Sequence, residues 1–167
     1  MFLPGCAYPV KTGILVFSCM KKILFVLIVL PASFCTVAQK AKDSTAIKKV
    51  LEKEAATWRS GDVKAHAECW SIKPYTRSFV SLADGTCYDV PPENIVNPPG
   101  GRMGNGGFAA LYNFTFSIQK RNAWVSHDEV SVAADGSKTY SHEIRLLEKI
   151  KGQWKLVGQS IHLYKPG

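Results

Sequence analysis

The stretch from Arg145 to Val157 decides the fold, and it reads RLLEKIKGQWKLV. Its centre, Lys151-Gly152, is a turn signal of the kind that joins two antiparallel strands. Apolar and polar residues alternate on both sides of this turn, which is typical of β-strands. We therefore expect a hairpin with strands over residues 138–150 and 153–164.

Similar signals occur toward the N-terminus. Asp84-Gly85 and Asp135-Gly136 are further hairpin turns, and residues 112–118 alternate between apolar and polar. Further strands are expected over residues 75–83, 86–90, 112–118 and 123–133. The prolines and glycines of residues 91–107 indicate a connecting loop, and residues 108–112 are interpreted as a short helix.

Two helices are expected before the strands. Asp43 or Ser44 can cap a helix that runs to about Arg59. Its apolar stripe recurs at three- and four-residue steps and comprises Ile47, Val50, Leu51, Ala55 and Trp58. Gly61 ends this helix, and Asp62 caps a second one, which has Val63, His66, Ala67 and Trp70 on one face. Helices followed by a long antiparallel meander are typical of an α+β domain.

Three segments resemble the nuclear transport factor two-like, or SnoaL-like, superfamily: residues 56–62, the hairpin around Asp84-Gly85 and residues 145–157. The resemblance extends from Asp43 to Tyr164. It implies a cone-shaped, cystatin-like α+β barrel, in which a strongly curved antiparallel sheet wraps round the N-terminal helices and leaves a pocket at the open end. The superfamily includes steroid isomerases, dehydratases, polyketide cyclases and non-catalytic binding or dimerising modules. The aspartates that a steroid isomerase would use cannot be placed in this sequence.

The N-terminal residues have the pattern of an export signal. Met20-Lys21-Lys22 precedes an apolar run, residues 23–30, and small residues lead to a cleavage position after Ala38; together these features are typical of a secretory signal peptide. We therefore expect Met20 to be the true start, residues 1–38 to be a leader and residues 39–167 to form one exported domain, periplasmic or secreted. The apolar run is shorter than the roughly 20 residues of a membrane-spanning helix, so no span is expected after cleavage.

The composition of the chain limits the classes of molecule that it is expected to bind. The formal net charge of the chain is +8, but acidic residues interrupt its lysines. Nucleic-acid binding needs a concentrated basic face, so no nucleic-acid partner is expected. Two cysteines follow the leader, Cys69 and Cys87, and they are either a disulfide or two free thiols. The spacing of the cysteines and histidines does not match a metal site, and no metal or cofactor is expected.

The hairpin turns also predict which side chains share a face of the sheet. If Asp135-Gly136 is a two-residue turn, Glu129 lies opposite His142, and His127 is on the same side. The face expected to turn toward the helices consists of Val125, His127, Glu129, Tyr140, His142, Ile144, Leu146, Val157, Gln159, Ile161 and Leu163. The other face would be wetter and would include Trp124 and Trp154. One extra residue in a strand would exchange the two faces.

The polar members of the inward face are the candidate site. A buried carboxylate or imidazole needs a partner, and Glu129 opposite His142, with His127 nearby, would form an acid–base group because imidazole titrates near neutral pH. The candidate ligand-binding residues are Trp58, His66, Trp70, Tyr140 and Gln159. The alternative is that these residues are structural, with His66 a core histidine, the two tryptophans core fillers and Glu129–His142 an ion pair.

Three functions remain open. The first is the binding of a small, partly apolar molecule in a conical pocket. The second is a lyase or isomerase that uses the His/Glu acid–base pair. The third is an interaction module that forms a homodimer through the open sheet face, where exposed tryptophans favour contact.

Overall fold

The computed structural model describes the backbone of residues 15–167 and the side chains of residues 38–167. The chain divides into two compact units, Met1–Ala41 and Lys42–Gly167, and the second unit contains the entire sheet. The side chains of the expected leader, residues 1–38, lie outside the described part except for Ala38, and the leader remains a prediction. Within the described part of the chain, no helix is both long and apolar enough to span a membrane.

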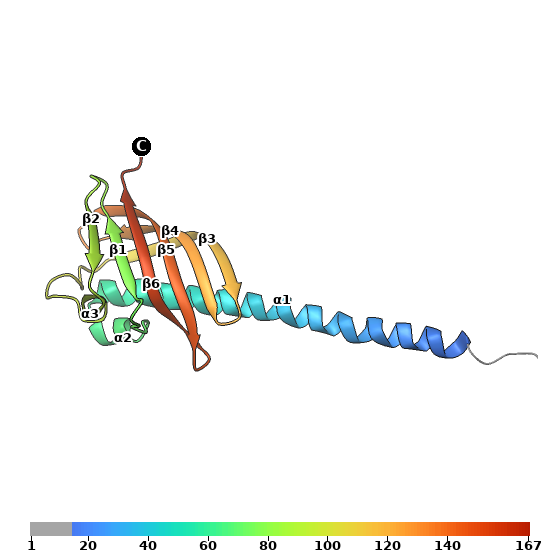
Figure 1. Ribbon diagram of the computed structural model, residues 1–167. Helices are drawn as coiled ribbons and strands as arrows, with labels where there is room; N and C mark the ends of the chain where they lie inside the picture. The colour runs from blue at the N-terminus through green and yellow to red at the C-terminus, as the bar shows by residue number, and fades with distance from the viewer. Residues whose placement is uncertain (1–14) are drawn as a thin grey trace, which may run out of the picture. The chain divides into compact units, whose positions relative to one another are not determined.

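The second unit combines helices with a curved six-stranded sheet (Figure 1). The elements are α1 (Leu15–Ser60), α2 (Val63–Ala67), β1 (Arg77–Ser81), β2 (Cys87–Val90), α3 (Pro92–Val96), β3 (Phe108–Gln119), β4 (Asn122–Val132), β5 (Lys138–Ile150) and β6 (Gln153–Tyr164). The strand order is β2-β1-β6-β5-β4-β3. Neighbouring strands are antiparallel except for β1 and β6, which are parallel, so the sheet is mixed.

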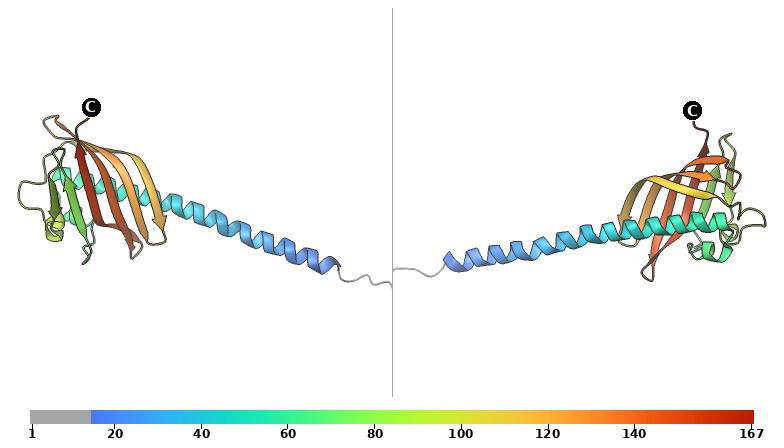
Figure 2. Two further views of the ribbon diagram at one scale, coloured as in Figure 1. Left: turned by 45° about the horizontal axis from the view of Figure 1, so that its top comes forward. Right: turned by 180° about the vertical axis from the view of Figure 1, so that it is seen from behind.

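The sheet curves because two of its ladders contain register shifts, one in β3–β4 after Tyr112 and one in β5–β6 between Leu146 and Leu147. In Figure 2 the C-terminal end of α1 lies across the concave face. Ile47 and Leu51 of this helix are almost fully buried and pack in one cluster with Val125, Leu147 and Leu156 of the sheet. The expected apolar stripe of α1 is therefore the side that covers the sheet.

The start of the second unit is fixed by Asp43. Its Oδ1 accepts hydrogen bonds from Trp154 Nε1 at 3.0 Å and from Lys149 Nζ at 2.6 Å. Asp43 was expected to cap the helix, but α1 begins at Leu15, and the carboxylate is instead a buried acceptor for β5 and β6. Trp154 was expected on the wetter face of the sheet, but its side chain is buried in the hydrophobic core.

Two other local expectations were wrong. Residues 108–112 belong to strand β3, because their backbone pairs with residues 128–132 of β4; sheet pairing overrides the helix propensity of Ala-Ala-Leu. The expected loop over residues 91–107 contains helix α3, which starts with Pro92 in the first turn, where proline is well tolerated. Cys69 and Cys87 are both free thiols, the first buried and the second exposed.

The most important correction concerns the β4–β5 turn, which has three residues, 134–136, rather than two. Ala133 N–H donates to Ser137 O at 2.9 Å, and Gly136 has a φ of +83°, the geometry of a three-residue hairpin loop with a final left-handed residue. Glu129 therefore pairs with Ser141, and His142 pairs with Asp128. The predicted Glu129–His142 pairing is wrong.

Because the turn is one residue longer than expected, the side chains of β5 that were predicted to face inward face outward, and the reverse. Only β5 is reversed in this way. Ser141, Glu143 and Arg145 are buried against the helices, whereas His142 and Leu146 face outward. Strand β6 keeps its predicted orientation beyond residue 158, because the extra residue Val157 compensates for the shift. Gln159, Ile161 and Leu163 thus lie on the inner side as expected, although His142 pairs with His162 instead of Ile161.

Candidate functional site

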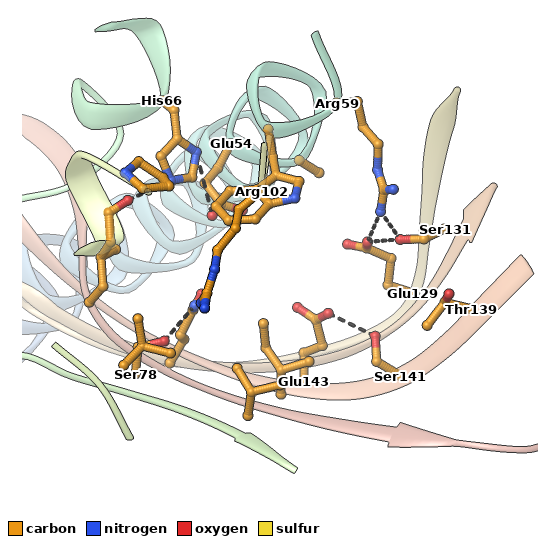
Figure 3. Close-up of a pocket in the computed structure, with 18 of the residues that line it drawn as sticks. Glu54, Arg59, His66, Ser78, Arg102, Glu129, Ser131, Thr139, Ser141 and Glu143 are labelled. Atoms are coloured by element: carbon orange, nitrogen blue, oxygen red, sulfur yellow. Dashed lines mark hydrogen bonds and ion pairs between the residues drawn. The ribbon is translucent and has the colours of Figure 1, made fainter. Parts of the chain in front are cut away.

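The second unit contains a pocket of about 370 Å³ between the end of α1, helix α3, the loop after α3 and the inner face of the sheet (Figure 3). Its apolar wall is formed by Trp58, Val80, Val90, Ile95, Ile161 and Leu163. Its charged side chains are Glu54, Arg59, Arg102, Glu129, Glu143 and Arg145. The pocket therefore has an apolar side and an unusual number of ionisable groups.

The loop after α3 is held against the end of α1. Gly104 N–H donates to Trp58 O at 2.9 Å, and Gly106 N–H donates to Arg59 O at 3.0 Å. The last carbonyls of a helix have no partner within the helix, so these bonds both complete α1 and fix the loop. Gly61 and Gly104 both have positive φ, and a Cβ on Gly61 would lie 3.2 Å from Gly104 Cα. Glycine is required here because the two backbones touch.

Helix α2 closes the pocket from the other side. Asp62 Oδ1 accepts a hydrogen bond from Ala65 N–H at 2.9 Å, which confirms the expected N-cap. The cap places His66 in the interior, where its Nε2 lies 3.1 Å from Ile95 O and its ring is 5.3 Å from that of Trp58. Its Nδ1 lies 3.8 Å from Glu54 Oε1. His66 therefore links α1, α2 and α3 at the wall of the pocket.

The base of the pocket is a buried polar network centred on Arg145. The guanidinium donates to Glu143 Oε2 and to Gln159 Oε1, and its Nη1 lies 3.6 Å from Glu54 Oε2. Glu143 Oε1 accepts from Ser141 at 2.8 Å, and Gln159 Nε2 donates to Ser78 Oγ at 2.8 Å. The network connects α1, β1, β5 and β6, so it positions the helix and the sheet relative to one another.

A second polar group lies toward the β3–β4 side. Glu129 Oε1 accepts from Ser131 Oγ at 2.6 Å and lies 3.6 Å from Arg59 Nη2. Arg59 also donates to Ser131 Oγ, so the three side chains form a closed triangle, as Figure 3 shows. Glu129 Oε2 makes no hydrogen bond to the described residues. One oxygen of this carboxylate is thus fixed, and the other is free.

The two neighbouring carboxylates are shifted in opposite directions. Burial raises the pKa of Glu129, and the negative charge of Glu143 raises it further. Burial acts in the same direction on Glu143, but the positive charge of Arg145 and the hydrogen bonds from Ser141 and Arg145 outweigh it and lower its pKa. Glu129 is therefore the carboxyl that holds a proton more readily, while Glu143 stays ionised beside Arg145.

Four of the predicted site residues line the pocket: Glu129, Trp58, His66 and Gln159. His127 is buried behind it, with Nε2 3.7 Å from Glu143 Oε2 and its ring 5.2 Å from that of Phe114. Burial and the nearby Arg145 lower the pKa of His127, which favours a neutral imidazole.

The other predicted site residues lie elsewhere. Trp70 is a core residue whose backbone bridges to Leu156. His142 and Tyr140 are on the outer face, because the three-residue turn reverses β5; His142 bonds Asp128 at 2.5 Å and stacks on Tyr164. The structure does not bring His142 together with Glu129 or His127.

Sequence reasoning missed Glu54, Arg59, Arg102, Glu143 and Arg145. Glu54 carried a signal, because it follows Ile47 by seven residues and Leu51 by three and so falls within the apolar stripe of α1. A charged residue in such a stripe indicates a buried polar partner. Glu143, Arg145 and Leu147 occupy every second position of one strand and so share a face. With the correct turn length this face would have been predicted to point inward. Arg102 lies in a glycine-rich loop and carried no such signal.

The side chains described contain no cluster of three or more histidine, cysteine, aspartate or glutamate residues able to hold a metal ion. The acidic groups of the pocket are instead partnered by arginines and hydroxyls. What the arrangement offers chemically is a pocket lined by one carboxyl group of raised pKa, that of Glu129.

No protein-family model and no curated protein sequence matches the chain. Several solved structures share its fold. An NTF2-like protein with a cystatin-like fold from Novosphingobium aromaticivorans is 14% identical, with a TM-score of 0.60 over 81% of this chain and 91% of the other. An NTF2-like protein of unknown function from Shewanella baltica is 19% identical, with a TM-score of 0.52 over 75% of this chain and 97% of the other.

A putative Ca/calmodulin-dependent kinase II association domain from Exiguobacterium sibiricum is 11% identical, with a TM-score of 0.55 over 75% of this chain and 95% of the other. At these identities the similarity establishes the fold. The chain has the NTF2-like, cystatin-like fold, which confirms the expected α+β class and the resemblance seen in the sequence.

Glu129 and Glu143 should leave separate marks on the pH dependence of stability. The raised native pKa of Glu129 favours folding below its unfolded value of about 4.5, and this contribution is lost as the pH rises through the native pKa. Glu129→Gln should therefore raise the free energy of unfolding relative to wild type increasingly between about pH 4 and pH 8. Urea unfolding across this range measures the difference.

Two variants control this experiment. Glu143→Gln removes a carboxyl group whose pKa is lowered by folding. In wild type such a group stabilises the fold above its unfolded pKa, and this stabilisation is lost as the pH falls through its native pKa; the variant should therefore lack this contribution. Glu52→Gln changes an exposed carboxylate on α1 and should leave the profile unchanged. Parallel profiles for Glu129→Gln and wild type would contradict the assignment of the proton to Glu129.

Proposed function

We propose that this domain binds a small, partly apolar molecule in the pocket between α1 and the sheet. The observation that carries the proposal is the pocket itself, about 370 Å³ in volume, with an apolar wall and convergent polar groups. Ligand sites of small-molecule binding proteins have this combination and a volume of roughly 300–1,000 Å³. The polar groups would orient the ligand, and the apolar wall would supply most of the binding free energy.

The polar contacts at the base of the pocket support a space that can hold a ligand, and not an incompletely packed hydrophobic core. Arg145 is held by hydrogen bonds to Glu143 and Gln159 and by an ion pair with Glu54, and these contacts keep the polar side chains at the base of the pocket in place. The helix is therefore held away from the sheet at this end, while at the other end Ile47 and Leu51 pack fully. The space between is available to a ligand.

A filled pocket should lose binding. Leu163 lines the pocket and is partly exposed, whereas the adjacent His162 faces outward. Leu163→Trp should abolish the binding of 2-naphthamide, a neutral and partly apolar probe, whereas His162→Trp should bind it as wild type does. Calorimetry measures binding, and circular dichroism checks that both variants are folded. Undiminished binding by a folded Leu163→Trp variant would remove the proposal, and so would wild type that binds neither 2-naphthamide nor its carboxylate analogue 2-naphthoate.

A second candidate is an enzyme of the lyase or isomerase kind. The observation that favours it is Glu129, whose pKa is raised by burial and by Glu143, and whose Oε2 is free at the pocket while Ser131 and Arg59 hold the other oxygen. A general base or acid is most effective when its pKa lies near the working pH. Glu129 then takes the role of proton carrier that the sequence suggested for a histidine.

Proton transfer can be tested without the natural substrate. With a carbonyl probe such as 2-tetralone in deuterated buffer, wild type should accelerate exchange of the hydrogens beside the carbonyl, as followed by NMR. Glu129→Gln should reduce this acceleration by about 100-fold or more, the usual contribution of a positioned base. Glu52→Gln is the control. An exchange rate no faster than that of buffer would argue against this chemistry.

We also propose that the outer face of the sheet forms a homodimer. Phe79, Trp124 and Leu146 are 46%, 43% and 44% exposed on this face, and Trp124 pairs with Leu146 across β4–β5. A second groove of about 340 Å³ runs along Phe79 and Leu146. Exposed apolar side chains gathered in this way favour protein–protein contact, and the same face of a second copy is complementary in character.

Sedimentation equilibrium tests the dimer. Leu146→Glu would place a charge in the centre of the contact and should shift wild-type dimers to monomers, whereas the control Val63→Glu changes an apolar residue that is also exposed but lies on α2. Wild type that stays monomeric at high concentration would argue against self-association.

We propose further that the domain acts after export, in the periplasm or outside the cell. The support is the signal-peptide pattern that ends at Ala38. The second compact unit begins at Lys42, so cleavage after Ala38 would remove none of it.

A further inference from the structure

Arg102 differs from the other charged residues of the pocket. It lines the pocket from the loop after α3, and Figure 3 shows its side chain extending over the space that Glu54, Glu129 and Glu143 surround. Among the described residues its guanidinium has no hydrogen bond and no ion pair. Its backbone, in contrast, is held by a turn in which Arg102 N–H donates to Pro99 O at 3.4 Å.

The carboxylates of Glu143 and Glu54 already lie beside other positive or hydrogen-bonding side chains. Glu143 uses Oε1 for Ser141 and Oε2 for Arg145. Glu54 lies beside Arg145 with one oxygen and beside His66 with the other. The carboxylate of Glu143 is thus fully engaged at the base of the pocket, whereas Arg102 is left with its five N–H donors directed at solvent or at a ligand.

We propose that the ligand carries a carboxylate and that Arg102 binds it. The inference rests on the proposed binding function and adds the chemical class of the ligand: a small, partly apolar carboxylic acid in its ionised form. A guanidinium donates two parallel hydrogen bonds to a carboxylate, a stronger and more directional contact than a neutral pair makes. The apolar part would lie against Trp58 and the apolar wall.

The side chains near Arg102 also favour an anion. Asn94 and Asn105 line the pocket, and within the part of the chain described their side-chain amides make no hydrogen bond. Amide N–H₂ groups donate to a carboxylate as readily as to a neutral oxygen. Asn105 lies between Gly104 and Gly106, whose backbone N–H groups bond the end of α1, and Asn94 lies on α3, where the next residue, Ile95, contacts His66 through its carbonyl. Both donors are therefore presented on fixed backbone.

A cationic ligand fits the pocket less well. It would need a carboxylate that is not already paired with a positive side chain. Glu54 and Glu143 lie beside Arg145, and Glu129, whose Oε2 has no hydrogen bond among the described residues, lies beside Arg59. Burial and the neighbouring Glu143 favour the protonated form of Glu129. A protonated Glu129 donates a hydrogen bond instead of attracting a cation, which adds to the donors available for a carboxylate.

The experiment compares two probes of nearly the same shape, 2-naphthoate and 2-naphthamide, which differ in charge. Wild type should bind the carboxylate about 10-fold or more tightly than the amide, as expected for a charge-assisted pair. Arg102→Gln should remove this preference by lowering the affinity for the carboxylate far more than the affinity for the amide. Arg102→Lys should keep part of it, because lysine retains the charge but loses the two parallel donors.

Lys138→Gln is the matched control, since it removes one positive charge from an exposed position at the start of β5, outside the pocket. It should behave as wild type does. Equal affinity of wild type for the two probes, or an unchanged preference in Arg102→Gln, would overturn the carboxylate assignment while the binding function stands. No binding of either probe by wild type would overturn the binding function itself.

Discussion

The ion pair between Arg145 and Glu143 determines most of the architecture around the pocket. Both side chains are almost completely buried, and removing one partner from a buried pair typically costs about 3–5 kcal/mol, because the other charge is left without compensation. The pair also reaches Glu54 on α1 and, through Gln159, Ser78 on β1. Four elements are therefore joined by polar contacts that fix their separation. An apolar core could close this space by repacking, whereas a buried polar network keeps it open, because closing it would break polar contacts.

The network exists because of two local irregularities in the sheet. The three-residue turn before β5 turns Glu143 and Arg145 inward, and the extra residue at Val157 keeps Gln159 on the same side as Arg145. With a two-residue turn and a regular β6, Arg145 would face solvent and Glu54 would be buried without a cation. Bulges commonly re-aim side chains next to functional sites. Here they determine which charges meet, and so they determine the character of the pocket.

Much of the fold could be predicted from the sequence, because turn residues and apolar periodicity are local signals. The bounds of β5 and β6, the cap at Asp62 and the covering face of α1 follow from them. The candidate site depended on a register that changes with a single residue, and Asp135-Gly136 is compatible with loops of two or three residues. His142 was therefore placed inside and Glu143 outside, the reverse of the structure. Arg102 could not have been found in this way, since its position depends on bonds between a loop and the end of α1.

The two halves of the pocket differ in how far their polar groups are satisfied, and this difference bears on function. At the base, Arg145 is matched by Glu54 and Glu143, and further donors or acceptors there would have to displace existing contacts. On the solvent side, Arg102 offers donors that nothing else in the described structure accepts, and Glu129 keeps one free oxygen beside the apolar wall. Desolvating a guanidinium is unfavourable unless a ligand replaces its water with hydrogen bonds. The free energy of binding would therefore depend on a group that can pair with Arg102, whereas the base would limit the depth to which the ligand enters.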